Sequence, residues 1–206
     1  MPPAPKPRSN QHLRTRKDLL LAAARLLKEG RKPTMDDVAA AALVSRATAY
    51  RYFPSLESLL VEAPLDGAAP DPDTFFGPDV SSDPEERLDR AEAAMHQMTY
   101  QNEAQLRLML ANLLVHGSAG GASSAVPPRQ NRRTPLIEAA LAPARRRFSK
   151  EAYDNLRAAL ALVFGTEAMV VFRDVLPLSE RRARGVKSWA IRALVRAALK
   201  DSRSDS

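Results

Sequence analysis

The sequence predicts an all-α protein, with a helix-turn-helix domain of three short helices at the N-terminus and a larger helical bundle behind it. Apolar residues recur every three or four positions through most of the chain, and no segment shows the two-residue alternation of a strand. The 206 residues are 45% hydrophobic, which is enough for a buried core in each part. Segments rich in proline and glycine separate the helical patterns.

The first predicted helix spans residues 12–29. Residues 1–11 are rich in proline and carry two basic residues, so we expect a flexible basic arm there. Gly30 ends the helix and Pro33 precedes the next one. Its core-facing residues are Leu19, Leu20, Ala23, Leu26 and Leu27.

Two short helices with N-terminal caps follow. Thr34 caps the second helix, which begins at Met35, and Asp37 favours the positive end of its dipole. Ser45 caps the third helix, and Pro54 limits its length. A fourth helix is expected at residues 55–63, which completes a helix-turn-helix domain at residues 12–63.

The third helix has the side chains of a DNA-contacting helix. Arg46 and Thr48 lie in its first turn, where a guanidinium can bind guanine O6 and N7. Tyr50 and Tyr52 suit phosphate contacts, while Phe53 is expected in the core. The alternative is a small helical domain that never contacts DNA, with both tyrosines in its core.

The positive charge of the chain is concentrated on the same domain. The net charge is +7 and the isoelectric point is about 10.0. Through Ala63 there are 11 basic and 6 acidic residues, an excess of +5. This distribution favours a polyanionic partner such as double-stranded DNA, whereas a solvated charged face is the simpler alternative.

The segment VSRATAYRYFPSLESLL resembles the turn, recognition helix and fourth-helix start of the tetracycline-repressor (TetR) family of transcription regulators. The resemblance implies base-facing positions at Arg46, Ala47 and Thr48 and phosphate contacts at the tyrosines. With the capping residues and the neighbouring arginine, the candidate DNA-binding residues are Thr34, Ser45, Arg46, Ala47, Thr48, Tyr50, Arg51 and Tyr52.

Two positions depart from the family pattern. Leu43 stands where the family usually has a glycine in the turn, and a leucine with positive φ costs about 1 kcal/mol. Leu56 stands where a lysine often neutralises a phosphate. Both departures predict weaker DNA affinity and leave the base-contacting side chains in place.

A linker and a helical domain fill the rest of the chain. Five prolines and several aspartates predict a linker at residues 64–84. The helical domain spans residues 85–200 and is followed by a tail at 201–206, and the GSAGGASS segment lies in a flexible connection at 117–133. The expected helices are 85–100, 102–116, 135–147, 150–174 and 179–200.

The last two helices carry an apolar stripe that is too wide for one packing contact. A homodimer that packs these helices into a four-helix interface would bury the stripe, and the TetR resemblance implies the same arrangement. Two half-sites on DNA also suit a dimer. The alternative is that both faces pack within one monomer.

The sequence offers no basis for catalysis, and we predict no enzyme activity, cofactor or metal. The three histidines lack metal-ligand spacing, and neither a phosphate-binding glycine motif nor a nucleophile elbow is present. Since the TetR resemblance implies a small-molecule effector in the helical domain, the candidate ligand-binding residues are Glu92, His96, Tyr100, Asn112, His116 and Glu167. Each of them is also compatible with an ordinary core or surface role.

Together these features predict a ligand-responsive repressor that binds a palindromic operator as a homodimer. Zero cysteines and no long apolar segment predict a cytoplasmic protein without a membrane span. The alternative is a helical ligand-binding or interaction protein whose DNA-binding domain is weakened and non-specific. Leu43, Leu56 and the proline-rich linker favour this alternative.

Overall fold

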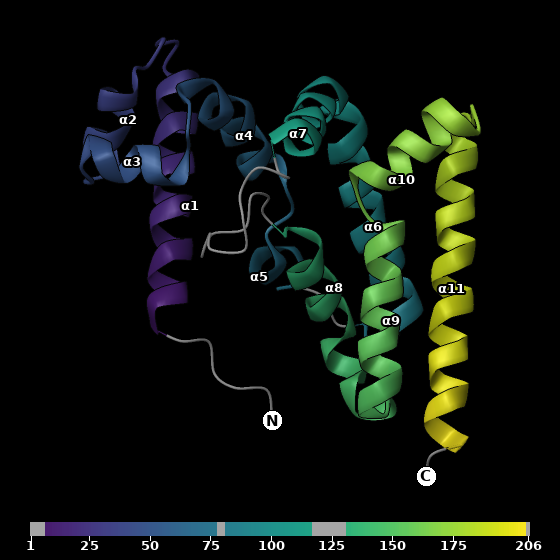
Figure 1. The fold of residues 1–206 in the computed structure, drawn as a ribbon. Coiled ribbons are helices and arrows are strands. Elements are labelled where there is room, and N and C mark those ends of the chain that lie inside the picture. Colours follow the sequence, from purple (N-terminus) through teal and green to yellow (C-terminus); the bar gives the residue numbers. More distant parts are fainter. Residues whose placement is uncertain (1–6, 78–80, 117–130, 205–206) are drawn as a thin grey trace. The chain divides into compact units, whose positions relative to one another are not determined.

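A computed structural model describes residues 7–77, 81–116 and 131–204, and all regular elements in these ranges are helical (Figure 1). The all-α prediction is therefore confirmed. The chain divides into two compact units, one formed by residues 1–68 and 104–130 and the other by residues 69–103 and 131–206. We call helices α1–α4 of the first unit the head and the described residues of the second unit the body.

The head consists of α1 (Pro7–Lys28), α2 (Met35–Ala41), α3 (Arg46–Tyr52) and α4 (Leu56–Ala68). Helix α1 packs against α2 and α4, and α2 packs against α3. The alanines at 39 and 49 are buried, as close helix crossing requires. The core is formed by Leu19, Leu20, Leu26, Met35, Val38, Phe53 and Leu59 with several alanines.

Helix α1 begins at Pro7 rather than at residue 12, so part of the expected arm is helical; residues 1–6 lie outside the described ranges. Helix α4 likewise continues past residue 63 to Ala68, with Pro64 inside it. A proline removes only one helical hydrogen bond when the helix is otherwise held by packing. Leu65, which follows it, is fully buried and provides that packing.

The predicted caps shape the helix-turn-helix. Thr34 and Asp37 form a capping box at α2, and Ser45 accepts from the backbone N–H of Thr48 at α3. Between these helices Leu43 adopts φ 56°, and the hydrogen bonds from Leu43 N to Ala40 O and from Val44 N to Ala39 O form a Schellman motif. The turn thus keeps the left-handed backbone that glycine would favour.

The body begins with α5 (Pro72–Phe75), a short helix inside the expected linker, followed by α6 (Pro84–Gln101). Helix α7 (Glu103–His116) follows α6 in the sequence, but beyond Glu103 it belongs to the first unit, and residues 117–130 lie outside the described ranges. Helix α6 packs against α8 (Arg133–Leu141) and α11 (Glu180–Ser204). It is therefore the central helix of the body.

Two expected helices are interrupted. Helix α8 gives way to a 3₁₀ helix, Ala142–Arg147, and the buried Arg87 donates to the Ala139 and Ala140 carbonyls at its end. The prediction of one continuous helix at residues 150–174 is wrong. It consists of α9 (Lys150–Val163), α10 (Thr166–Val170) and a π-helical turn, Val171–Val175, because Gly165 adopts φ 102° and breaks the helix.

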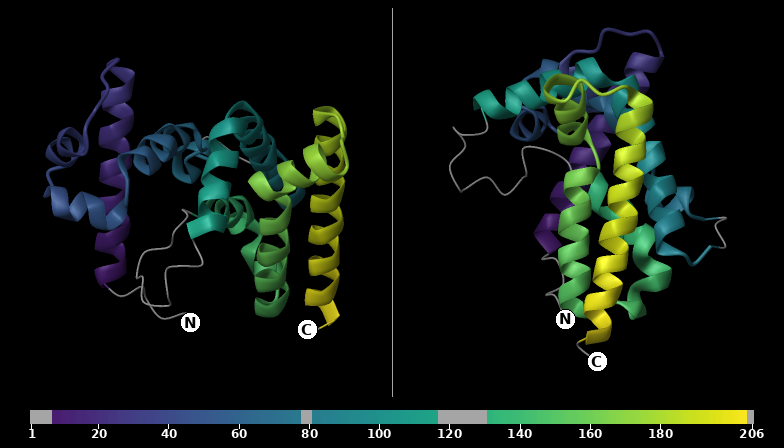
Figure 2. Two further views of the ribbon diagram at one scale, coloured as in Figure 1. Left: turned by 45° about the horizontal axis from the view of Figure 1, so that its top comes forward. Right: turned by 90° about the vertical axis from the view of Figure 1, so that its right-hand side faces the viewer.

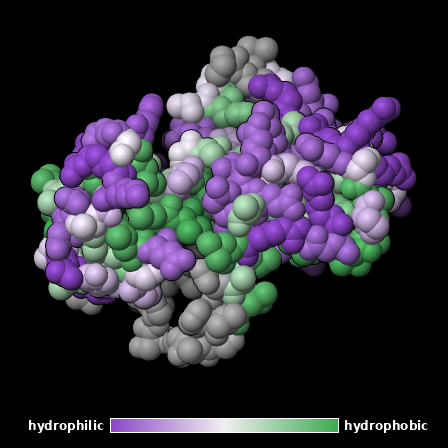
Figure 3. Space-filling model, turned by 90° about the horizontal axis from the view of Figure 1, so that it is seen from above, coloured by the Kyte–Doolittle hydropathy of each residue, from purple (hydrophilic) through white to green (hydrophobic). Residues whose placement is uncertain are grey.

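Helices α9 and α11 lie side by side (Figures 1 and 2). Their inner residues are buried, but Leu162 and Trp189 keep 77% and 66% of their surface exposed. Figure 3 shows that hydrophobic and hydrophilic side chains are interspersed over the face that it presents. In the described ranges, no helix combines the length and the apolar character needed to span a membrane.

Candidate functional sites

Helix α3 exposes the side chains that the sequence assigned to DNA. Arg46, Ala47, Tyr50 and Arg51 are exposed and Thr48 is half-buried. Ala49 and Tyr52 face the head core. One side of the helix therefore packs against the head core, while the other exposes a guanidinium, a small side chain and a phenol to solvent.

Arg46 is held loosely at this surface. Its Nη1 lies 3.1 Å from Asp36 Oδ2, and its guanidinium stands 5.6 Å from the centre of the Tyr50 ring. The hydrogen bond with Tyr50 and the charge of Asp36 raise the pKa of Arg46. Because both members of the ion pair are more than half exposed, the pair adds little stability and can be exchanged for a contact to a base.

The candidate hydroxyls hold the starts of the two helices. Thr34 Oγ1 donates to Asp37 Oδ2 over 2.7 Å, and the hydrogen bonds from Thr34 lower the pKa of Asp37. Ser45 Oγ lies 2.9 Å from Thr48 Oγ1 and accepts from the Thr48 backbone N–H. These contacts fix the backbone of the N-terminal turn of α3, from which the Arg46 side chain extends.

Tyr52 lies in a different environment from the one expected. The residue is only 8% exposed, and its hydroxyl lies 2.9 Å from Nδ1 of His12. The guanidinium of Arg51 stands over the ring, and Thr48 lies at the same small cavity of about 340 Å³. A phosphate contact from Tyr52 stays a prediction, and it would have to come from the hydroxyl at this cavity.

A comparison with known families matches residues 19–63 to the bacterial regulatory proteins of the tetR family. The head is therefore a TetR-type DNA-binding domain. The matched range contains the capped turn and all of α3, so the TetR-family head is a DNA-binding helix-turn-helix that acts in transcription regulation. Comparisons of the chain with curated proteins and with solved structures give no match.

The body contains a cavity of about 960 Å³ between α6, the Val171–Val175 turn and the start of α11. His96, Tyr100 and Phe75 contribute rings to its wall. The other lining side chains are mostly polar, and they include Arg90, Gln97, Gln101, Arg173, Glu180, Arg181 and Arg184. Its size is that of a cavity for a small organic molecule.

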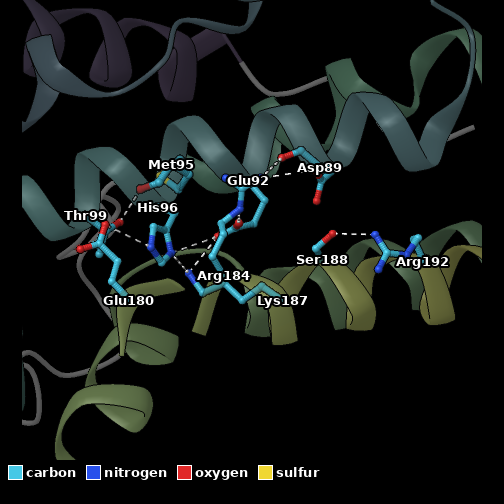
Figure 4. Close-up of polar contacts among 10 residues, drawn as sticks. All are labelled: Asp89, Glu92, Met95, His96, Thr99, Glu180, Arg184, Lys187, Ser188 and Arg192. Atoms are coloured by element: carbon cyan, nitrogen blue, oxygen red, sulfur yellow. Dashed lines mark hydrogen bonds and ion pairs between the residues drawn. The ribbon is translucent and has the colours of Figure 1, made fainter. Parts of the chain in front are cut away.

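A buried charged cluster backs this cavity (Figure 4). Glu92 and Lys187 are 0% and 1% exposed, and Lys187 Nζ donates to Glu92 Oε1 over 2.8 Å. Arg184 Nε lies 3.0 Å from the other carboxylate oxygen of Glu92, and Arg184 also pairs with Asp89. Burial raises the pKa of Glu92, and the charges of Lys187 and Arg184 act against that rise.

His96 connects the cluster to the cavity. Its Nδ1 lies 3.1 Å from Lys187 Nζ, and its ring stacks on Tyr100 with centroids 4.2 Å apart. Burial, and after it the positive charges of Lys187, Arg184 and Arg173, lowers the pKa of His96 to about 4. The imidazole is therefore neutral at pH 7.

The remaining ligand candidates are spread apart. Glu92 lies behind the cavity wall, and Glu167 pairs with Arg133 over 2.7 Å without lining the cavity. The side chains of Asn112 and His116 lie outside the described residues. Of the six candidates, the structure brings His96 and Tyr100 together at the cavity.

Sequence reasoning missed the basic residues of α11. Lys187 is spaced four residues from Ala183 and Ile191, and both of these are fully buried. A lysine on the buried face of an amphipathic helix indicates a buried partner, and that signal was available in the sequence. Within the described ranges, no group of three or more histidine or acidic side chains is placed to hold a metal ion.

Proposed function

We propose that this TetR-family regulator is a ligand-responsive repressor that binds a palindromic operator as a homodimer. The observation that carries the proposal is the family match on a head whose α3 exposes Arg46 at its N-terminal turn. Arg46, Ala47 and Thr48 face the bases, with Arg46 bound to a guanine. Tyr50, Arg51 and Tyr52 contact phosphates, and Thr34 and Ser45 hold the two helix starts against the backbone.

The two departures from the family pattern affect affinity rather than the proposed mode of binding. Leu43 adopts the positive φ that the turn requires, so the cost is backbone strain and the path of the chain is kept. Leu56 removes one positive charge that would face a phosphate. The bases would still be contacted by the side chains of α3.

The proposed dimer interface is the outer face of α9 and α11. Leu162 and Trp189 are exposed there, and Ala193 and Ala197 continue the α11 stripe with small exposed side chains. Such a face favours a close helical contact with a second copy. Size-exclusion chromatography with light scattering tests this, and a single species of 22.6 kDa at micromolar concentration would contradict it.

The proposed effector site is the body cavity, and the proposed location of the protein is the cytoplasm. A ligand alters operator affinity only if it binds two arrangements of the dimer unequally. The cavity borders α11, which is also half of the proposed interface, and this shared helix supports a coupling between ligand and dimer geometry.

A second candidate function is a helical ligand-binding protein whose head binds DNA weakly and without specificity. The strained Leu43 and the uncharged Leu56 favour it. The two functions differ in sequence selectivity, because charge alone gives binding that is lost as salt rises.

Selection of bound sequences from a random DNA pool at physiological salt tests the proposal. The expected result is a palindrome whose half-sites are about one helical turn apart. Recovery of no common sequence, with binding that disappears at higher salt, would contradict it and support the second function.

A further inference from the structure

We infer that the body cavity binds an organic anion, a flat molecule with a carboxylate that accepts a hydrogen bond from Nε2–H of His96. The inference names the chemical class of the effector and so rests on the proposed function of this cavity. Its basis is the direction of hydrogen bonds in the cluster, the charge of the wall and the rings that line it.

The hydrogen bonds fix which nitrogen of His96 carries the proton. A lysine ammonium can only donate, so His96 Nδ1 accepts from Lys187 over their 3.1 Å contact. The neutral ring then carries its proton on Nε2. That atom is buried without a hydrogen-bond partner among the described residues, and the whole side chain is only 5% exposed. A buried donor beside a cavity indicates an acceptor on the ligand.

The wall around this donor is positive. Arg90, Arg173, Arg181 and Arg184 line the cavity, and Glu180 is the one acidic residue among the lining residues. Asp89, Glu92 and Glu103 partly neutralise Arg184 and Arg173. Arg181 is exposed at the rim and forms no ion pair within the described ranges. An arginine in this position binds a carboxylate strongly because it can offer two parallel hydrogen bonds.

The rings of the wall favour a flat ligand body. His96 and Tyr100 are stacked with an interplanar angle of 23°, and Arg173 stands 5.0 Å from the centre of the Tyr100 ring. Phe75 adds a third ring. The hydroxyl of Tyr100 is buried without a hydrogen-bond partner in the described part of the chain, so it provides a second polar contact for a substituted ring.

Glu180 indicates where the carboxylate of the ligand would lie. Its Oε1 is 3.6 Å from His96 Nε2, too long for a hydrogen bond but close enough to occupy the same space (Figure 4). The Glu180 side chain is 57% exposed and can turn away into solvent. It therefore acts as a tethered competitor, and removing its charge should tighten anion binding.

Isothermal titration of the full chain with 2-naphthoate, 2-naphthamide and inorganic phosphate tests the inference. We expect 2-naphthoate to bind about tenfold more tightly than the neutral 2-naphthamide, as the loss of one charged hydrogen bond implies. Phosphate should bind more weakly still because it lacks the ring. Equal affinity for the acid and the amide, or no binding of the acid, would overturn the inference, and preferred binding of phosphate would replace the organic ligand by an inorganic anion.

Three variants and one control test whether 2-naphthoate binds in the body cavity. Arg181→Ala should weaken 2-naphthoate about tenfold, Glu180→Gln should tighten it several-fold, and His96→Phe should weaken it while keeping the stack on Tyr100. Arg192→Ala is the matched control, because Arg192 bonds only Ser188 in Figure 4 and does not line the cavity. Since Arg181 and Glu180 are exposed, their variants keep the test valid even if His96→Phe fails to fold. Unchanged affinity for 2-naphthoate in both the Arg181→Ala and the Glu180→Gln variants would contradict the assignment of the site to this cavity.

A separate measurement of operator binding distinguishes this inference from the proposed function. Binding of 2-naphthoate with the variant pattern above supports the anion site whatever its effect on DNA. If the selected operator is then bound equally with and without saturating 2-naphthoate, the ligand response of the proposed function is contradicted while the anion site stands.

Discussion

The head and the body each bury an acidic residue against a cation from a helix that is distant in the sequence. The two ion pairs differ in the other contacts that the cation makes. In the head, both guanidinium nitrogens Nη1 and Nη2 of Arg16 donate to Glu62, over 2.7 and 2.6 Å, and the guanidinium lies 4.7 Å from the centre of the Phe53 ring. In the body, Lys187 is shared between Glu92 and His96. The head pair joins α1 to α4, whereas the body cluster leaves one donor facing a cavity.

This difference separates two uses of buried charge. A bidentate pair in a packed core holds two helices in one register. The Nε atom of Arg16 is also buried without a hydrogen-bond partner in the described residues, but Arg16 lines neither of the two cavities described above. The body cluster has two carboxylates, Glu92 and Asp89, for its two cations, Lys187 and Arg184, so its charge is balanced. The neutral imidazole of His96 still has a hydrogen-bond donor to offer. A buried donor without a partner therefore indicates a binding site where it also borders a cavity, as His96 does.

The largest expected effect is in the head. Arg16→Ala should lower the free energy of unfolding by about 3–5 kcal/mol, because it leaves the carboxylate of Glu62 buried without its bidentate partner. Urea denaturation followed by circular dichroism measures this. Arg14→Ala, an exposed arginine on the same helix, is the control. A loss below about 1 kcal/mol would mean that the pair does not secure α1 to α4.

The equivalent change in the body should cost less. Lys187→Met should lower the free energy of unfolding by about 2 kcal/mol, since Arg184 still neutralises Glu92 and the methionine fills much of the lysine volume. The same urea titration with Arg192→Ala as control checks it. A loss of unfolding free energy as large as that of Arg16→Ala would show that Arg184 does not compensate for Lys187, and the two buried clusters would then not differ in this respect.

The body cluster should also make stability depend on pH. The folded pKa of His96 is about 4, below its ordinary 6.5, so between these values the unfolded chain binds a proton that the folded chain does not. The His96 contribution is therefore fully present above pH 6.5 and is lost as pH falls, by about 1.4 kcal/mol per pH unit at most. The raised pKa of Glu92 acts in the opposite direction.

Comparison with His96→Phe isolates this contribution, because Glu92 and the other histidines are present in both proteins. Urea midpoints at pH 7, 6 and 5 should fall more steeply for the parent chain than for the variant. Parallel pH profiles would show that His96 titrates as an ordinary exposed histidine.

The smallest expected effect concerns the turn of the head. Leu43 is 93% exposed with φ 56°, while Gly30 adopts φ 73° in the equivalent Schellman turn after α1. Leu43→Asn should raise the free energy of unfolding by about 1 kcal/mol, because asparagine tolerates the left-handed region better. Leu13→Asn, at an exposed leucine within α1, should give no gain. Equal changes in the free energy of unfolding at both positions would show that the gain at Leu43 does not come from backbone strain.

Local signals predicted the head well. Thr34 and Ser45 cap their helices as expected, and the turn at Leu43 takes the positive φ that its place in the motif implied. Helix caps and apolar spacing depend on residues that lie within a few positions of one another, so both can be recognised in the sequence. Tyr52 was assigned outward, but burial depends on how α3 sits on α1, which the alternation of residues in one short helix does not determine.

The body site was only partly predictable. Glu92 and His96 are four residues apart and share a face of α6, so they were found together. Their partners Lys187 and Arg184 lie more than ninety residues away on α11, and no local pattern links the two helices. Glu167 was a candidate ligand-binding residue, yet it pairs with Arg133 from α8, another contact that only the fold creates.

Selection of bound DNA by the Arg46→Ala variant, compared with the parent chain, tests whether α3 recognises the operator. We expect the base preference of the variant to relax at one base pair in each half-site, at a cost of about 1–3 kcal/mol in binding free energy, with the preference at other positions unchanged. Arg51→Ala should instead weaken binding to all sequences alike. An unchanged base preference in the Arg46→Ala variant would contradict the assignment of α3 as the helix that recognises the operator.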